Sequence, residues 1–444
     1  MVAEAKAAIR VGNLDLAAAN LEKAMLLAPR DPSVAVDYGD VLVSQGRYPD
    51  AIAAFQTALK ISPRNLAAEV GSATAFRKLR NFEEAKLTLQ RSIGEHPKSP
   101  QPLALLGDIE IELQTYDAAI GHLSAALALD PADNQTRNLL AASYKAKGDS
   151  QNALLQLDKV LARDPDNALA HFLRGEIYAD SNEDEKALAE AQKAVDLQPQ
   201  NARAQVLLGK ILVRIPPAAT PAQTLSRCQK AVAALQPLEH SSAVDSETLF
   251  LLSRAYRCAG QDDLAKRALT EFEASSQNDR STRQNQTQAV HLVQQADELA
   301  MKNDFAGSLA LIQQAIQTDP TYPAAYSQLA KLYFSAGEID KASDAIAQAL
   351  ARNPNEPDFL YVQGKILERQ GRWDDAIASF TKSTLVNPEE SDSFYELGTI
   401  YQRRSDLARA RAAFKRAVEI APDDPDYRRA LEALSSTSPS APSR

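Results

Sequence analysis

Prolines spaced 34 residues apart are the feature that most constrains the fold of this chain. Two series have this spacing: Pro29, Pro63, Pro97, Pro131, Pro165 and Pro199, and then Pro320, Pro354, Pro388 and Pro422. A fixed period of this length is typical of a solenoid, in which one small unit of secondary structure is repeated and stacked. The spacing therefore predicts a repeat protein whose surfaces bind partners.

The residues between the prolines predict what each repeat contains. With the closing proline at place 32, the small residues Gly39 and Ala51 fall at places 8 and 20 of the second repeat. The large residues Leu42 and Phe55 fall at places 11 and 24. Apolar spacing of three, four and seven predicts two amphipathic helices, which approach closely at the small residues. Place 15 is often glycine, which suits a left-handed helix end, and the closing proline stops the second helix.

This repeat resembles the tetratricopeptide repeat, a helix–turn–helix unit of 34 residues. The resemblance covers nearly the whole chain and implies an all-α fold, an α-solenoid superhelix of about twelve such repeats. Residues 425–434 resemble the capping helix that covers the last repeat of such a stack. The first repeat is clipped, because its place 1 would lie before Met1. The alanine- and glutamine-rich repeats are similar to those of bacterial proteins.

The two proline series are out of phase, and the extra residues divide the chain. Repeats one to six occupy residues 1–199, and repeats seven and eight, with insertions, occupy 200–273. Residues 274–288 are polar and contain no glycine or proline, so a flexible linker and a bridging helix between two blocks both fit. The remaining segments are repeats nine to twelve at 289–424, the capping helix at 425–434 and a disordered polar tail at 435–444.

Composition and charge exclude several classes of function. The net charge of −9, most of it in residues 1–199, argues against non-specific nucleic-acid binding. No stretch approaches the roughly 18 apolar residues of a membrane span, and the N-terminus has no signal-peptide core. We therefore expect a soluble protein, cytoplasmic or periplasmic. Two cysteines cannot form a disulfide framework, so we interpret Cys228, near place 24 of repeat seven, and Cys258, at place 13 of repeat eight, as inert thiols.

The sequence contains no arrangement of residues typical of catalysis. None of the five histidines lies in a metal-ligand pattern, and there is no glycine-rich phosphate loop. We therefore expect no enzymatic activity, no metal and no cofactor.

The resemblance implies that the first helices line the concave face, with places 2, 5, 6, 9, 12 and 13 directed towards it. Two partner-binding patterns of the family, a clamp for acidic C-terminal peptides and an asparagine ladder at place 6, are missing. Place 6 instead carries leucine in five successive repeats: Leu105, Leu139, Leu173, Leu207 and Leu251. This leucine stripe predicts a groove for a partner helix or extended peptide. The alternative is core packing between neighbouring first helices.

Place 9 changes the sign of its charge along the chain. It is acidic at Asp40, Asp108 and Glu176, and basic from repeat seven onwards. The basic wall, with two interleaved tyrosines at place 5, consists of Lys210, Arg254, Lys331, Tyr361, Lys365, Arg369, Tyr395 and Arg403. Cations beside aromatic faces suit an anionic or peptide partner. The alternative is a solvated face with internal ion pairs, to which Glu368 and Glu396 would contribute.

These features predict a non-enzymatic scaffold that binds a protein or peptide in its concave groove. Two alternatives remain open. One is a periplasmic module that assists polysaccharide or pilus export, with Tyr361 and Tyr395 stacking on the sugars of an anionic polysaccharide. The other is the regulatory arm of an enzyme encoded upstream.

Overall fold

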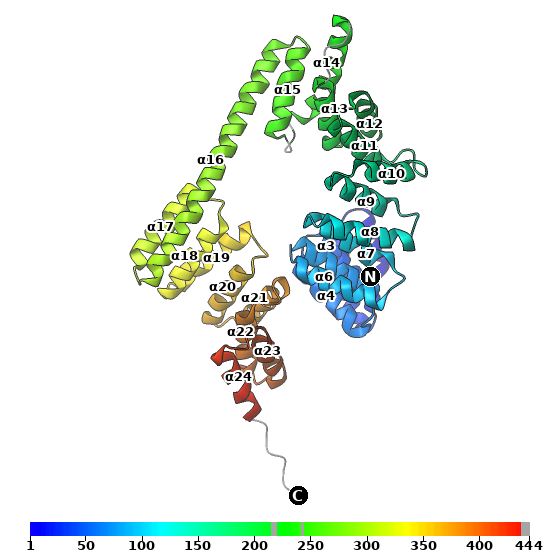
Figure 1. Ribbon diagram of the computed structural model, residues 1–444. Helices are drawn as coiled ribbons and strands as arrows, with labels where there is room; N and C mark the ends of the chain where they lie inside the picture. Colours follow the sequence, from blue (N-terminus) through cyan, green and yellow to red (C-terminus); the bar gives the residue numbers. More distant parts are fainter. Residues whose placement is uncertain (215–219, 240, 242–243, 437–444) are drawn as a thin grey trace. The chain divides into compact units, whose positions relative to one another are not determined.

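The computed structural model describes residues 1–214, 220–239, 241 and 244–436. These residues form the helices α1 to α24 and one short 3-10 helix, η1, with no strand among them (Figure 1). Most of the helices follow one another as short antiparallel pairs, one pair for each repeat. The prediction of an all-α fold built from helix pairs is confirmed.

The first helices begin at place 1 of their repeats, except for α1, which belongs to the clipped first repeat. They are α1 (Val2–Arg10), α3 (Pro32–Ser44), α5 (Leu66–Lys78), α7 (Pro100–Glu112), α9 (Asn134–Ala146), α11 (Ala168–Asp180), α13 (Ala202–Arg214), α15 (Ser246–Cys258), α18 (Pro323–Ser335), α20 (Pro357–Arg369) and α22 (Ser391–Arg403). Place 34 supplies the N-cap: the side chains of Asp31, Asn65 and Asn167 accept hydrogen bonds from backbone N–H groups of the first turn. These caps fix where α3, α5 and α11 begin.

The second helices end shortly before the closing prolines. They are α2 (Leu14–Leu27), α4 (Tyr48–Ile61), α6 (Phe82–Glu95), α8 (Tyr116–Leu129), α10 (Ser150–Leu161), α12 (Asp184–Leu197), α14 (Pro221–Leu235), α17 (Phe305–Thr318), α19 (Ile339–Arg352), α21 (Trp373–Val386) and α23 (Leu407–Ile420). In α4 the last helical residue is Ile61, two before Pro63. Proline lacks an N–H and restricts the residue before it, so each helix stops there.

Close packing within a repeat depends on glycine at place 8. A Cβ atom added to Gly39, Gly364 or Gly398 would lie 2.5 Å from the phenylalanine at place 24 of the same repeat. These phenylalanines, Phe55, Phe380 and Phe414, are fully buried. The predicted pairing of small and large places is therefore confirmed in these repeats, where a larger residue at place 8 would push the two helices apart.

Repeat seven departs from the pattern and corrects one interpretation. Leu235, not Cys228, packs against Gly209 at place 8, because the residues inserted before α14 shift the whole helix. Cys228 lies two turns earlier in α14 and forms a disulfide with Cys258 at the end of α15, with a Cα–Cα distance of 5.5 Å. The expectation of two inert free thiols is wrong, because the shift brings the two cysteines together. After α14 the chain continues through η1 (Gln236–Leu238).

Helix α16 (Asp262–Met301) joins the second helix of repeat eight to the first helix of repeat nine (Figure 1). It is 40 residues long and includes all of 274–288, so this segment is helical. Repeat eight lacks a closing proline, so no residue interrupts the helix.

The chain divides into two compact units. Unit 1 consists of residues 1–88 together with the chain from Thr282 onwards, and unit 2 is Leu89–Ser281. Within unit 1, α4 contacts α21, and Asn81 Nδ2 donates to the carbonyl oxygen of Val386 at 2.8 Å. The proposed division of the chain into two blocks at 274–288 stays a prediction.

Helix α24 (Pro425–Ser436) covers the end of the last repeat. Leu434 is buried against Ala410 and Phe414 of α23, which confirms the predicted capping helix. Of the predicted disordered tail, residues 435 and 436 belong to α24, and 437–444 lie outside the described residues. In the described part of the chain, no helix has both the length and the hydropathy that a membrane crossing requires.

Candidate functional site

The first helices form the layer that carries the candidate site. Second helices pack on their own first helix and on the next one, as α8 does on α7 and α9 and as α12 does on α11 and α13, and successive first helices also contact each other directly. In unit 2 these contacts join α9 to α11, α11 to α13, and α13 to α15; in unit 1 they join α18 to α20. The first helices thus form a continuous inner layer within each of these runs, and places 2, 5, 6 and 9 lie along it.

The leucine stripe lies largely in the hydrophobic core. Leu173, Leu207 and Leu251 are less than a tenth exposed and belong to the core of unit 2. Leu105 and Leu139 are half-buried. The prediction that the stripe contacts a partner therefore depends chiefly on Leu105 and Leu139, because the other three side chains offer little free surface.

The lysines of the basic wall are paired with carboxylates of the following repeat. Lys210 Nζ lies 2.7 Å from Glu247, and Lys331 Nζ lies 2.9 Å from Asp358. Lys365 Nζ lies 2.7 Å from Glu396. The ion pairs cross from one first helix to the next, so they fix neighbouring repeats relative to each other and neutralise much of the predicted positive charge.

The last of these pairs belongs to a network of four charges. Glu368 accepts from Arg403 at 2.9 Å and lies 3.5 Å from Lys365. Burial raises the pKa of Glu396 above its ordinary value, and the bond from Lys365 opposes that rise. Burial also acts against the charge of Lys365, but the bonds and charges of Glu396 and Glu368 prevail and raise the pKa of that lysine. The four side chains thus form one connected network within the folded protein.

The aromatic residues of the wall are packed within the repeats. The ring of Tyr361 lies 5.8 Å from that of Phe380. Tyr395 contacts Phe414 at 5.6 Å and Tyr427 of the capping helix at 5.1 Å, measured between ring centroids. These contacts leave Tyr395 little free face on which a sugar ring could stack.

Two arginines of the wall, Arg254 and Arg369, differ from its lysines and from Arg403. Arg254 lies over the ring of Phe250 at 5.9 Å, and Arg369 lies over that of Phe334 at 5.6 Å. Both side chains are exposed, and neither forms an ion pair with any residue that the structure describes. Arginines stacked in this way keep the edge of the guanidinium available to an anion.

A hollow of about 390 Å³ is lined by α11, α13, α15 and η1 of unit 2. The buried side chains of Phe172, Leu207 and Leu238 contribute apolar surface to it. Arg203 lies over the ring of Phe172 at 4.9 Å, and its side chain is 77% exposed. Its nearest carboxylate, on Glu176, is 4.0 Å away, whereas Lys145 binds that carboxylate at 2.7 Å. The hollow therefore combines apolar surface with an arginine that is weakly engaged.

Sequence reasoning did not single out Arg203 as a site residue. It occupies place 2 of repeat seven and Phe172 occupies place 5 of repeat six, and both places are directed inward in the family. Comparing place 5 of each repeat with place 2 of the next would have found the pair.

Family models for the tetratricopeptide repeat match most of the sequence. One matches residues 42–109 and 299–366, and the other matches 2–65, 138–213 and 361–425. The chain belongs to the tetratricopeptide repeat family. A search of curated proteins found no significant match.

Several solved structures resemble the chain, two of them described as tetratricopeptide repeat proteins. A tetratricopeptide repeat protein from Parabacteroides merdae is 19% identical over 57% of this chain and 96% of its own, with a TM-score of 0.45. YrrB, described as a TPR protein with an unusual peptide-binding site, is 24% identical over 41% and 95%, with a TM-score of 0.34. A chain of the APC/C hetero-tetramer Cut9–Hcn1 is 13% identical over 97% and 95%, with a TM-score of 0.31.

Proposed function

We propose that this protein is a non-enzymatic scaffold that binds a segment of a partner protein along the inner layer of α11, α13 and α15. Membership of a repeat family whose members bind proteins supports this function. The observation that carries it is the hollow of about 390 Å³, a volume near the lower end of the range for ligand-binding pockets, with room for an apolar side chain of a partner.

The partner segment carries an apolar side chain next to a carboxylate. The apolar group enters the hollow against Phe172 and Leu207, and the carboxylate meets the fork of Arg203. A guanidinium binds a carboxylate through two parallel hydrogen bonds, so this arrangement fixes the direction of the segment. Arg254, one repeat further on, offers a second contact for an anion.

The ion pairs between repeats support binding by keeping the surface rigid. Because Lys210 and Glu247 already hold each other, the two first helices do not need to be ordered when a partner arrives. Association then loses less conformational entropy than binding to a flexible surface would.

Affinity capture from the native cell with mass spectrometry, repeated with matched variants, tests the proposal. Val206 and Arg203 line the hollow. The variants Val206→Asp and Arg203→Glu are therefore expected to capture at least tenfold less partner than the wild type. Arg267→Glu is the control, since Arg267 pairs with Glu271 on the same helix and does not line the hollow. Circular dichroism would establish that each variant is folded. The same proteins captured in equal amounts by all variants would exclude this site.

A further inference from the structure

The side chain at place 4 of several first helices donates a hydrogen bond to the backbone carbonyl of the preceding closing proline. Arg137 Nη2 and Gln205 Nε2 each donate to such a carbonyl at 2.7 Å, on Pro131 and Pro199. Tyr326 Oη donates to the carbonyl of Pro320 at 3.1 Å. Arginine, glutamine and tyrosine are all donors at neutral pH, so these contacts do not depend on pH between about 5 and 8.

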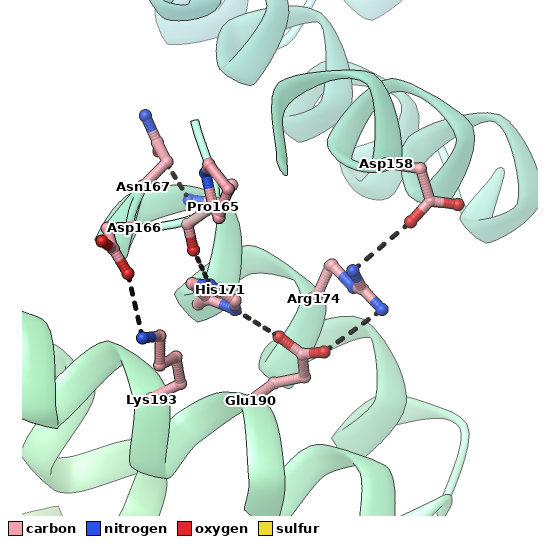
Figure 2. Close-up of polar contacts among 9 residues, drawn as sticks. Asp158, Pro165, Asp166, Asn167, His171, Arg174, Glu190 and Lys193 are labelled. Atoms are coloured by element: carbon pink, nitrogen blue, oxygen red, sulfur yellow. Dashed lines mark hydrogen bonds and ion pairs between the residues drawn. The ribbon is translucent and has the colours of Figure 1, made fainter. Parts of the chain in front are cut away.

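Repeat six has a histidine at the same place. His171 Nε2 lies 2.9 Å from the carbonyl oxygen of Pro165, and its Nδ1 lies 2.6 Å from Glu190 Oε2 (Figure 2). The other oxygen of this carboxylate, Glu190 Oε1, lies 3.2 Å from Arg174 Nη2. Both neighbours of the imidazole ring are therefore hydrogen-bond acceptors, and only a doubly protonated ring can donate to both.

Charged groups of α10, of the turn before α11, of α11 and of α12 form ion pairs near this ring (Figure 2). Asp158 on α10 lies 3.4 Å from Arg174 of α11. Asp166 in the turn before α11 pairs with Lys193 of α12 at 2.9 Å.

We propose that the joint between repeats five and six is sensitive to pH through His171. The protonated ring holds both the Pro165 carbonyl and Glu190, tying the turn after α10 to α12. The neutral ring has a single N–H and loses one of the two bonds. The contact between repeats five and six is then more stable at about pH 5.5 than at pH 8. The equivalent contacts at Arg137, Gln205 and Tyr326 do not change over this range. This proposal does not depend on the proposed binding function.

Hydrogen exchange measured by mass spectrometry on the full chain, at pH 5.5 to 8.0 and corrected for intrinsic exchange rates, tests this joint. We expect the amides of α11 and α12 to exchange roughly fivefold faster at the upper pH, the effect of one net hydrogen bond. His171→Gln should remove the pH difference, because glutamine can hold the proline carbonyl as Gln205 does. His122→Gln is the control: His122 also contacts a glutamate, Glu110, at 2.8 Å but not a proline carbonyl. A pH response in His171→Gln equal to that of the wild type would overturn the proposal.

A second measurement observes the ring of His171 itself. Imidazole nitrogen NMR of wild-type protein labelled on its five histidines reports ring protonation directly. We expect the ring of His171 to carry two protons at pH 5.5 and one at pH 8. Its signal is identified as the one that is missing from the spectrum of His171→Gln. If His171 is neutral throughout this range, the joint has no pH switch.

Discussion

Place 15 shows how strongly a single residue position is constrained in this fold. The backbone there is left-handed in every repeat that the structure describes, with φ of 75° at Gly46 and 76° at Gly371. The same conformation is imposed on Arg80, Gln114, Asn182, Asn303 and Ser405, with φ between 57° and 62°. Non-glycine residues pay a steric penalty in this region, so these positions store strain that glycine would release.

Replacing Gln114 by glycine is therefore expected to stabilise the protein. The gain should be about 1 kcal/mol, reduced by the greater freedom of glycine in the unfolded chain. Thermal or urea unfolding followed by circular dichroism measures it. Gln114→Ala is the control and should give no gain, since alanine keeps the Cβ atom. A glycine variant no more stable than the alanine variant would contradict the expectation.

Glu390, before α22, should make stability depend on pH. Burial, and then the charges of Asp392 and Asp358, raise the pKa of this carboxyl above its ordinary 4.5. The folded state thus holds the proton more tightly than the unfolded state, and the ionised group destabilises the fold at pH 7. Glu390→Gln should raise the melting temperature at pH 7, and the gain should shrink as pH falls and vanish below about 4.5. Glu389→Gln, at the exposed neighbouring position, is the control; an equal gain there would contradict a local effect of Glu390.

At the scale of helices, repeats seven and eight are where the pattern is interrupted. The insertion before α14 shifts that helix relative to α13, and the disulfide then ties α14 to α15. Cys228 is buried and Cys258 is exposed at the helix end. A cross-link that closes a loop of this size restricts the unfolded chain and adds roughly 3–4 kcal/mol to stability.

Reduction should therefore lower the stability of this region. We expect dithiothreitol to lower the melting temperature of the wild type but not that of the double variant Cys228→Ser with Cys258→Ser. A thiol assay on the protein purified without reductant is the direct check. Two free thiols in that assay would mean that the disulfide does not form in its native compartment, since disulfides persist in oxidising environments.

The regular repeats follow from the sequence, and the irregular ones only in part. The 34-residue period predicts the start of helices such as α3 and α20, because capping and proline placement are local effects. The pairing of Gly39 with Phe55 is also predictable. The disulfide was missed because the position of Cys228 depends on how an insertion is shared between a turn and a helix. The ion pair of Lys210 with Glu247 was missed because it joins residues 37 positions apart, across repeats of unequal length.

At the scale of the whole molecule, α16 is the element shared by both compact units. Its middle, around Arg280 and Arg283, is mostly exposed and contains little apolar surface. A helix segment without tertiary packing is only marginally stable in water, so it should open locally more often than the paired helices.

Limited proteolysis is expected to cut first at this point. Trypsin should cleave after Arg280 or Arg283 and leave two folded fragments, identified by intact-mass spectrometry. Arg280→Gln with Arg283→Gln should delay that cleavage without changing the digestion of the rest of the chain. First cuts inside the paired helices of either unit would show that α16 is as well protected as they are.

The ion pairs of the inner layer also determine which repeats can be removed. Each lysine at place 9 of repeats seven and ten is matched by an acid at place 2 of the next repeat, Glu247 and Asp358. Deleting repeat eleven would bring Lys331 opposite Asp392, another acid at place 2, and the pair would be restored. Deleting repeat eight would bring Lys210 opposite Val290 and leave the lysine without its acid. Loss of repeat eleven, where the ion pair is restored, should therefore cost less stability than loss of repeat eight, where it is not.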